Sequence, residues 1–129
     1  STKFILEIVK YTPEGKKNKK LKIKKIKDND ISFTFKTEDK SLDSIISLNN
    51  KEKISANIPS LRKEYRIFIR ALKNGVSQGI GDFTISQLTF LKREEIIKKV
   101  INLNDYTKKN IIGKLSLRVK ITYSENNNN

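Results

Sequence analysis

The sequence contains no cysteine and no histidine. Without cysteine, neither a disulfide framework nor a thiolate metal site can form, and an oxidising compartment is not indicated. Without either residue, the usual general acid–base and nucleophile sets of enzymes are missing as well. We therefore expect a binding protein of a reducing compartment, without a cofactor, and no enzyme.

Long apolar runs and acidic residues are also scarce. The apolar runs are only a few residues long, far short of the roughly 20 residues that cross a bilayer as a helix. There are 14 acidic residues against 28 basic ones, which gives a formal net charge of +14 at pH 7. Such a charge concentrates polyanions such as lipid headgroups, nucleic acid or acidic protein tails. We expect a cytoplasmic protein that is peripheral to the membrane.

What the chain does have is enough apolar residues, spread over its 129 positions, for a single folded core. We expect one domain over residues 1–125 and a disordered asparagine tail over residues 126–129. A start without methionine and this tail also lead us to expect a fragment of a larger protein.

Alternation of apolar and polar residues with a period of two is the main local signal, and it is typical of strands. It predicts strands at residues 4–11, 20–27, 31–35, 41–48, 52–58, 63–72, 80–85 and 113–123. Residues 73–79 are expected to form a loop. Gly81 indicates a close approach of two backbones or a bulge.

Residues 86–99 depart from this alternation. Glu94 and Glu95 precede a pair of lysines by four residues, which is a spacing that supports a helix. We predict one short helix near residues 86–99. Eight strands with a single late helix predict an all-β fold, an eight-stranded antiparallel β-sandwich with Greek-key connections.

The most charged stretch is "KKNKKLKIKKIK", residues 16–27, with eight lysines and no acidic residue. Leu21, Ile23 and Ile26 favour a strand with lysines on its outer face, although a run of charge is often only a solvated surface. Clustered lysines attract anionic bilayers at about 1 kcal/mol each. The predicted anion-binding residues are Lys16, Lys17, Lys19, Lys20, Lys22 and Lys24, with Arg66 and Arg70 as a secondary group.

The second half of the sequence, "EYRIFIRAL…GIGDFTISQL…IIKKVINL…GKLSLRVKITY", resembles the closing half of a C2 domain. The resemblance implies a C2-like β-sandwich. Many C2 domains bind calcium through about five aspartates in two loops, because Ca²⁺ needs six to eight oxygen ligands. The corresponding connections here, residues 11–20 and 72–80, hold one acidic residue, Glu14, and several lysines. The resemblance therefore implies a calcium-independent module.

Such a module binds either anionic membrane lipid, phosphoinositide included, or a protein. The first alternative uses a lysine-rich face, and the second is a scaffold that docks a protein partner or an acidic protein tail. Nucleic acid is not expected, because single-strand binders stack bases on exposed rings. Phe33, Phe35 and Phe83 alternate with polar residues as core rings do, which leaves Phe68 as the ring that the pattern places outside.

Overall fold

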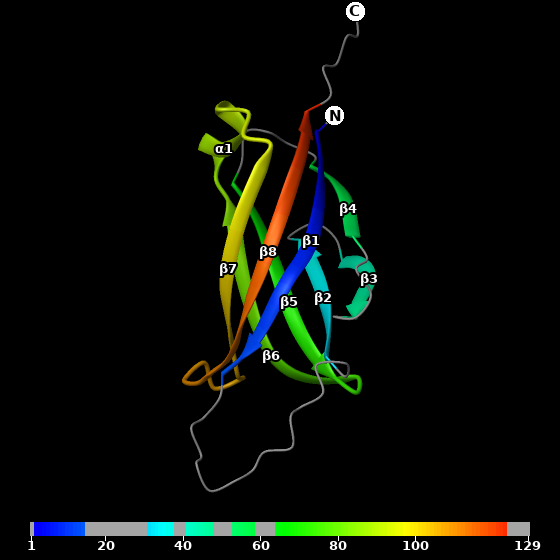
Figure 1. The fold of residues 1–129 in the computed structure, drawn as a ribbon, viewed down its shortest axis with the longest axis vertical. Coiled ribbons are helices and arrows are strands. Elements are labelled where there is room, and N and C mark those ends of the chain that lie inside the picture. The colour runs from blue at the N-terminus through cyan, green and yellow to red at the C-terminus, as the bar shows by residue number, and fades with distance from the viewer. Residues whose placement is uncertain (1, 15–30, 38–40, 48–52, 59–63, 124–129) are drawn as a thin grey trace, which may run out of the picture.

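The computed structural model describes residues 2–14, 31–37, 41–47, 53–58 and 64–123. These residues form eight strands and one short helix (Figure 1). The elements are β1 (Thr2–Pro13), β2 (Ile31–Thr37), β3 (Ser41–Ser47), β4 (Lys53–Ile58), β5 (Tyr65–Lys73), β6 (Val76–Ile85), α1 (Gln87–Leu91), β7 (Ile96–Asn104) and β8 (Ile111–Tyr123). Every strand pairing is antiparallel, so the prediction of an antiparallel all-β fold is confirmed.

The strands make one continuous curled sheet in the order β3-β2-β5-β6-β7-β8-β1-β4. We call β7, β8, β1 and β4 the front half, and β3, β2, β5 and β6 the rear half; in Figure 1, β7, β8 and β1 lie in front of β6, β5 and β2. The halves are joined through β6 and β7 by one residue pair, Ile80 with Asn104. The two separate sheets of the predicted sandwich are therefore not confirmed.

The two halves enclose a single core. Strand alternation turns one set of side chains inward, and the resulting cluster draws its buried residues from both halves. The Phe4 ring on β1 lies 6.1 Å from the Tyr65 ring on β5, and Tyr11 lies 5.4 Å from Phe33 on β2. Neither pair of strands is adjacent in the sheet, so these edge-to-face contacts join the halves across the core. The outer faces of the two halves consequently point away from each other.

The predicted helix near residues 86–99 is wrong beyond its first part. Helix α1 covers Gln87–Leu91 and is capped by Ser86, whose Oγ accepts a hydrogen bond from the Thr89 N–H at 3.4 Å. Strand β7 then begins at Ile96 and pairs with β8 along its whole length. Four of the first six residues of β7 are isoleucine or valine, which favour strands. Pairing with β8 outweighs the weak helical signal of the Glu–Lys spacing.

The predicted loop at residues 73–79 is also wrong, because it is a tight hairpin. Asn74 and Gly75 alone form the turn, with φ angles of 50° and 77°, and Lys73 pairs directly with Val76. An Asn-Gly turn with both φ angles positive matches the twist of the flanking strands. The predicted strand at residues 20–27 and the tail at residues 126–129 lie outside the described residues.

Gly81 lies where the backbones of β6 and β7 approach each other closely. A Cβ atom on Gly81 would lie 2.7 Å from Leu103 Cδ2 and 3.0 Å from the backbone oxygen of Asn102. The predicted close approach at Gly81 is therefore confirmed. This contact, beside the pair of Ile80 with Asn104, holds the middle of β6 against the end of β7.

Candidate functional site

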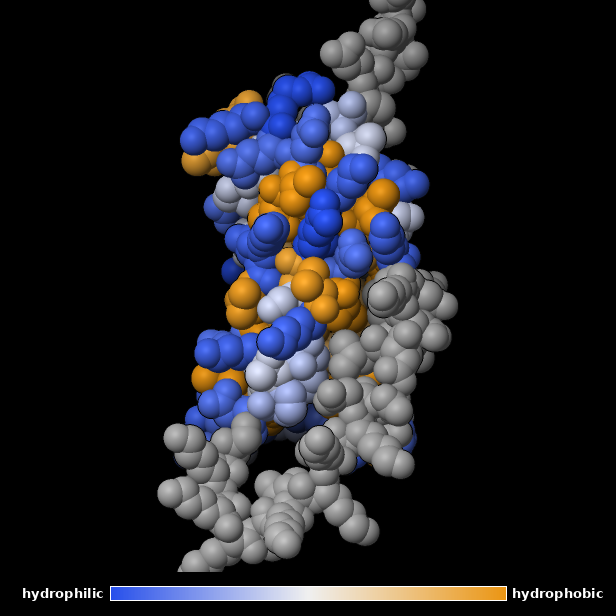
Figure 2. All heavy atoms as spheres, viewed as in Figure 1, coloured by the Kyte–Doolittle hydropathy of each residue, from blue (hydrophilic) through white to orange (hydrophobic). Residues whose placement is uncertain are grey.

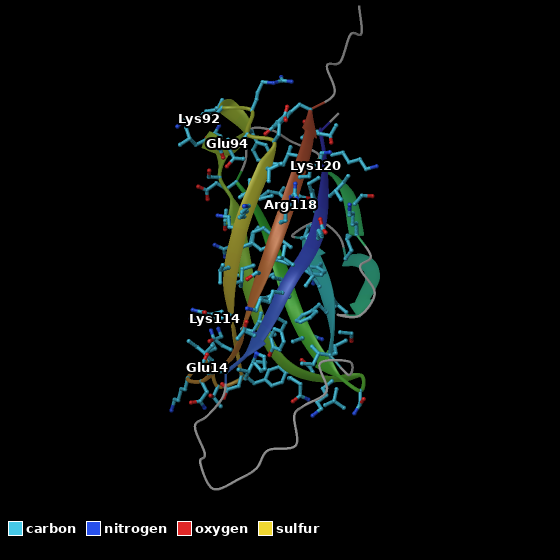
Figure 3. All side chains as sticks on the ribbon, in the orientation of Figure 1. Glu14, Lys92, Glu94, Lys114, Arg118 and Lys120 are labelled. Atoms are coloured by element: carbon cyan, nitrogen blue, oxygen red, sulfur yellow. The ribbon has the colours of Figure 1, made fainter. Side chains whose placement is uncertain are left out.

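The outer face of the front half is built around β8. Leu115, Leu117 and Val119 are buried, so the alternating residues Arg118 and Lys120 point outward and are exposed. Figure 3 shows Lys114, Arg118 and Lys120 spaced along this strand. Neighbouring strands add further outward side chains in register with them, because directly opposed residues share a face.

The register places Glu7 of β1 and Lys98 of β7 on either side of Arg118. Lys53 of β4 lies opposite Glu7, and Ile5 and Ile96 flank Lys120. We define the cationic face as the exposed outward cations of these four strands. Its members are Lys3, Lys10, Lys53, Lys98, Lys114, Arg118 and Lys120.

Glu7 is the one acidic side chain among the described outward residues of these strands, so seven cations oppose a single carboxylate. Alternate residues along a strand are separated by about 7 Å, so neighbouring cations such as Arg118 and Lys120 lie within about one Debye length of each other at physiological salt. Figure 2 shows the hydrophilic residues of this face with hydrophobic residues between them. The face is therefore a dense positive surface with apolar gaps.

A shallow groove lies in the middle of the cationic face. It has a volume of about 180 Å³ and is lined by Ile5, Glu7, Lys53, Arg118 and Lys120. Three of these side chains are cationic, and ammonium and guanidinium groups donate charge-assisted hydrogen bonds to phosphate oxygens. The groove can therefore accept a small anionic group, while the carboxylate of Glu7 restricts where that group sits.

The predicted site residues fall in two places. Lys16, Lys17, Lys19, Lys20, Lys22 and Lys24 lie outside the described residues. Arg66 and Arg70 are exposed on the outer face of β5, with Phe68, 38% exposed, between them. The rear half carries these arginines, so they point away from the cationic face and do not join it.

Reasoning from the sequence missed the cationic face. One signal was present, since Lys114, Arg118 and Lys120 occupy alternate positions of a strongly alternating segment. Lys98 was assigned to a helix instead. Most of the face comes from strands distant in sequence, so its composition depends on which strands are neighbours.

The upper end of the front half is fixed by Tyr123 of β8. Its hydroxyl donates a hydrogen bond to the Glu94 carbonyl at 2.8 Å, and the Arg93 guanidinium lies 4.9 Å above its ring. Burial raises the pKa of Tyr123 above its usual value of 10.0. These contacts tie the α1–β7 connection to the end of β8.

The lower end of the front half carries a second local network. The carboxylate of Asp105 accepts hydrogen bonds from Thr107 Oγ1 at 2.6 Å and from Asn110 Nδ2 at 2.9 Å. The hydrogen bonds from Thr107 and Asn110 lower the pKa of Asp105. This carboxylate is thus used in shaping the β7–β8 connection.

No group of three or more side chains suited to holding a metal ion occurs within the described ranges. In the same part of the chain, no helix is long and apolar enough to span a membrane.

The fold identifies the structural class of the chain. A solved structure of a C2 domain-containing protein is similar over 100% of this chain and 93% of its own, with a TM-score of 0.60 and 9% sequence identity. No protein-family model and no curated protein matches the sequence. The chain therefore has a C2-like fold, and at this identity the likeness concerns the fold alone.

Proposed function

We propose that the chain is a non-catalytic, calcium-independent C2-like module that binds anionic membrane lipid through the cationic face. The observation that carries this proposal is the excess of seven exposed cations over one carboxylate on one side of a rigid sheet. Basic side chains near an anionic leaflet contribute about 1 kcal/mol each. A rigid sheet presents these charges together, without the cost of ordering a flexible arm.

The apolar residues between the cations support a bilayer as the partner. Ile96 is 47% exposed and Val100 is 69% exposed, and both lie on the same side of β7 as Lys98. Such side chains gain free energy on reaching the headgroup boundary, at about 25 cal/mol for each Å² removed from water. Phosphoinositide or another acidic phospholipid would place a phosphate group in the groove beside Arg118 and Lys120.

Calcium independence rests on the scarcity of carboxylates where the family places its calcium loops. The β5–β6 turn consists of Asn74 and Gly75, and neither residue carries a charge. The other connection, residues 11–20, holds one acidic residue, Glu14, and its part from residue 15 onward lies outside the described residues. The lysines in this connection and just after it remain predicted contacts for the same membrane: Lys16, Lys17, Lys19, Lys20, Lys22 and Lys24.

Arg66 and Arg70 require a separate assignment. A flat bilayer that meets the front half does not reach the outer face of β5, because the two faces point in opposite directions. We propose that these arginines take no part in the main membrane contact. They therefore provide a control in the tests of the cationic face.

Co-sedimentation with vesicles tests the function. Vesicles of phosphatidylcholine alone, with added phosphatidylserine, or with added phosphoinositide are mixed with the protein at low and physiological salt. We expect pelleting with the anionic vesicles, less of it at physiological salt, and no change when EDTA is present. If the protein fails to pellet at low salt with every vesicle, membrane binding is wrong and the protein-docking alternative is favoured.

The lysine-rich connection is tested in the same assay with a Lys20→Glu/Lys22→Glu/Lys24→Glu variant. If these lysines contribute, this variant pellets less than the wild type with anionic vesicles. Equal pelleting of the two proteins would show that these lysines take no part in the membrane contact, which would then consist of the cationic face alone.

A further inference from the structure

Strand β7 is bonded to β8 along one edge, and the upper part of its other edge, residues 96–100, is open within the described chain. The Ile121 N–H donates a 2.7 Å hydrogen bond to the Glu95 carbonyl, which continues the β7–β8 register by one pair. Backbone groups of successive residues point to opposite sides of a strand. The odd-numbered residues of β7 therefore bond to β8, while the N–H and C=O groups of Ile96, Lys98 and Val100 point to the other edge.

Strand β6 does not pair with the upper part of this edge. The two strands share one residue pair, Ile80 with Asn104, at the lower end, where Gly81 allows their close approach. Within the described chain, residues 96–100 pair with β8 alone. Five residues of strand span about 17 Å, which is a typical length for a strand in a sheet.

The side chains along this open edge form a short pattern. Ile96, Lys98 and Val100 are exposed on the outer side of β7. Ile97 and Lys99 lie on the inner side and are half-buried. A strand added to this edge would therefore face residues 96 to 100, which are in order two apolar residues, two cations and one apolar residue.

We propose that this edge binds an extended segment of another protein as an added antiparallel strand, with two acidic residues opposite Lys98 and Lys99 and β-branched apolar residues at the flanking positions. Backbone hydrogen bonds to Ile96, Lys98 and Val100 would provide the affinity, and the side-chain pattern would provide the specificity. Charge complementarity selects the occupant. A second copy of the chain would bring another +14 and a like-charged edge, so it is disfavoured.

This edge overlaps the proposed membrane contact, because Lys98 belongs to the cationic face and the side chains of Ile96 and Val100 lie beside it. The two activities differ in the groups that they use: peptide binding depends on backbone N–H and C=O groups of β7, and membrane binding depends on side chains. N-methylation of the peptide alters the first without changing the protein, so a failure of peptide binding leaves the vesicle result unaffected, and the reverse also holds.

The probe is a fluorescein-labelled synthetic peptide with the core Val-Glu-Glu-Val-Val, flanked by uncharged polar residues, and binding to the full chain is measured by fluorescence anisotropy. An antiparallel peptide with this core meets residues 100 to 96 in the proposed pattern. A peptide of the same composition with the core Glu-Val-Val-Val-Glu tests specificity. A peptide N-methylated at the residues opposite Ile96, Lys98 and Val100 cannot donate hydrogen bonds to the carbonyls of these three residues, while its charge is unchanged.

We expect the first peptide to bind and both controls to bind at least about tenfold more weakly. The N-methylated peptide loses three backbone bonds of about 1 kcal/mol each, and the Glu-Val-Val-Val-Glu peptide places no carboxylate opposite Lys98 and Lys99. Val100→Pro removes one N–H from the open edge but leaves the bonds to β8, so it should weaken binding about fivefold. Val100→Thr keeps the N–H and the strand preference and should bind about as the wild type does.

Amide hydrogen exchange of the wild-type protein provides a readout that does not depend on any variant folding. In the free protein, the amides of Ile96, Lys98 and Val100 should exchange fast and those of Ile97 and Lys99 slowly. A saturating concentration of the peptide should slow the exchange of the amides of Ile96, Lys98 and Val100.

Equal binding of the N-methylated peptide, or unchanged exchange at the three open amides, would overturn the proposal. In either case, Lys98 and Lys99 would act only to protect an edge strand from aggregation. Concentration-dependent dimerisation of the wild-type chain through this edge would also overturn it, because the occupant would then be a second copy.

Discussion

Removing charge from the centre of the cationic face should weaken membrane binding by a predictable amount. The face has seven cations and one carboxylate, a net charge of +6 (7 − 1). At about 1 kcal/mol for each charge, this corresponds to about 6 kcal/mol and a dissociation constant of tens of micromolar. An Arg118→Gln/Lys120→Gln variant removes two of these charges, which should cost about 2 kcal/mol and lower vesicle affinity about 30-fold.

The assay is a lipid titration by co-sedimentation at low salt, with vesicles that contain phosphatidylserine. The matched control is Arg66→Gln/Arg70→Gln, which also lowers the net charge from +14 to +12 but acts on the opposite face. We expect this control to bind within about threefold of the wild type, since its charges lie far from the bilayer and are screened. Equal losses in the two variants would refute the reasoning, because overall charge rather than one face would then govern binding.

Three further predictions concern stability and calcium. Tyr123→Phe should lower the free energy of unfolding by about 1 kcal/mol at neutral pH in urea, through the lost hydrogen bond to Glu94. The raised pKa of Tyr123 means that the folded state holds the phenol proton more tightly than the unfolded state. The free energy of unfolding of the wild type should therefore fall as pH rises above 10.0 and through the raised pKa, and the variant should show a smaller fall. Identical pH profiles of the two proteins would contradict this. Gly113→Ala should lower the free energy of unfolding by about 1–3 kcal/mol, because the added Cβ would lie 2.6 Å from Cε1 of Tyr11. The control Ser116→Ala on the same strand should change it by less than about 0.5 kcal/mol. Equal effects of the two substitutions in urea unfolding would contradict the packing argument. Adding calcium or EDTA should change neither the melting temperature nor vesicle binding, and a calcium-dependent rise in either would disprove calcium independence.

Much of the fold was predictable because strand alternation is a local signal. The segment from Gly113 to Tyr123 alternates over its whole length and forms most of β8. Gly81 indicated the close approach of β6 and β7 correctly. Residues 96–99 were misassigned because a Glu–Lys spacing of four is also local, whereas the pairing of Ile96 with Lys120 that overrides it is not.

The candidate site could not be predicted in the same way. Lys53, Arg118 and Lys98 come from three strands, and only the order β7-β8-β1-β4 places them together. The run of lysines in the sequence indicates a binding site at residues 16–27. The cationic face, by contrast, consists of single basic residues contributed by four strands. Register between distant strands is the information that the sequence pattern does not contain.

The orientation of the domain on a membrane can be measured directly, because the chain contains no cysteine and accepts a single labelled one. An environment-sensitive fluorophore is attached to Ser116→Cys, between Lys114 and Arg118 on the front half, or to Thr84→Cys, opposite Arg66 on the rear half. Both parent residues are half-buried and uncharged. With anionic vesicles, the label at position 116 should shift to the blue and become protected from an aqueous quencher, while the label at position 84 should not change. The reverse result, or equal protection of both labels, would contradict a membrane contact through the front face.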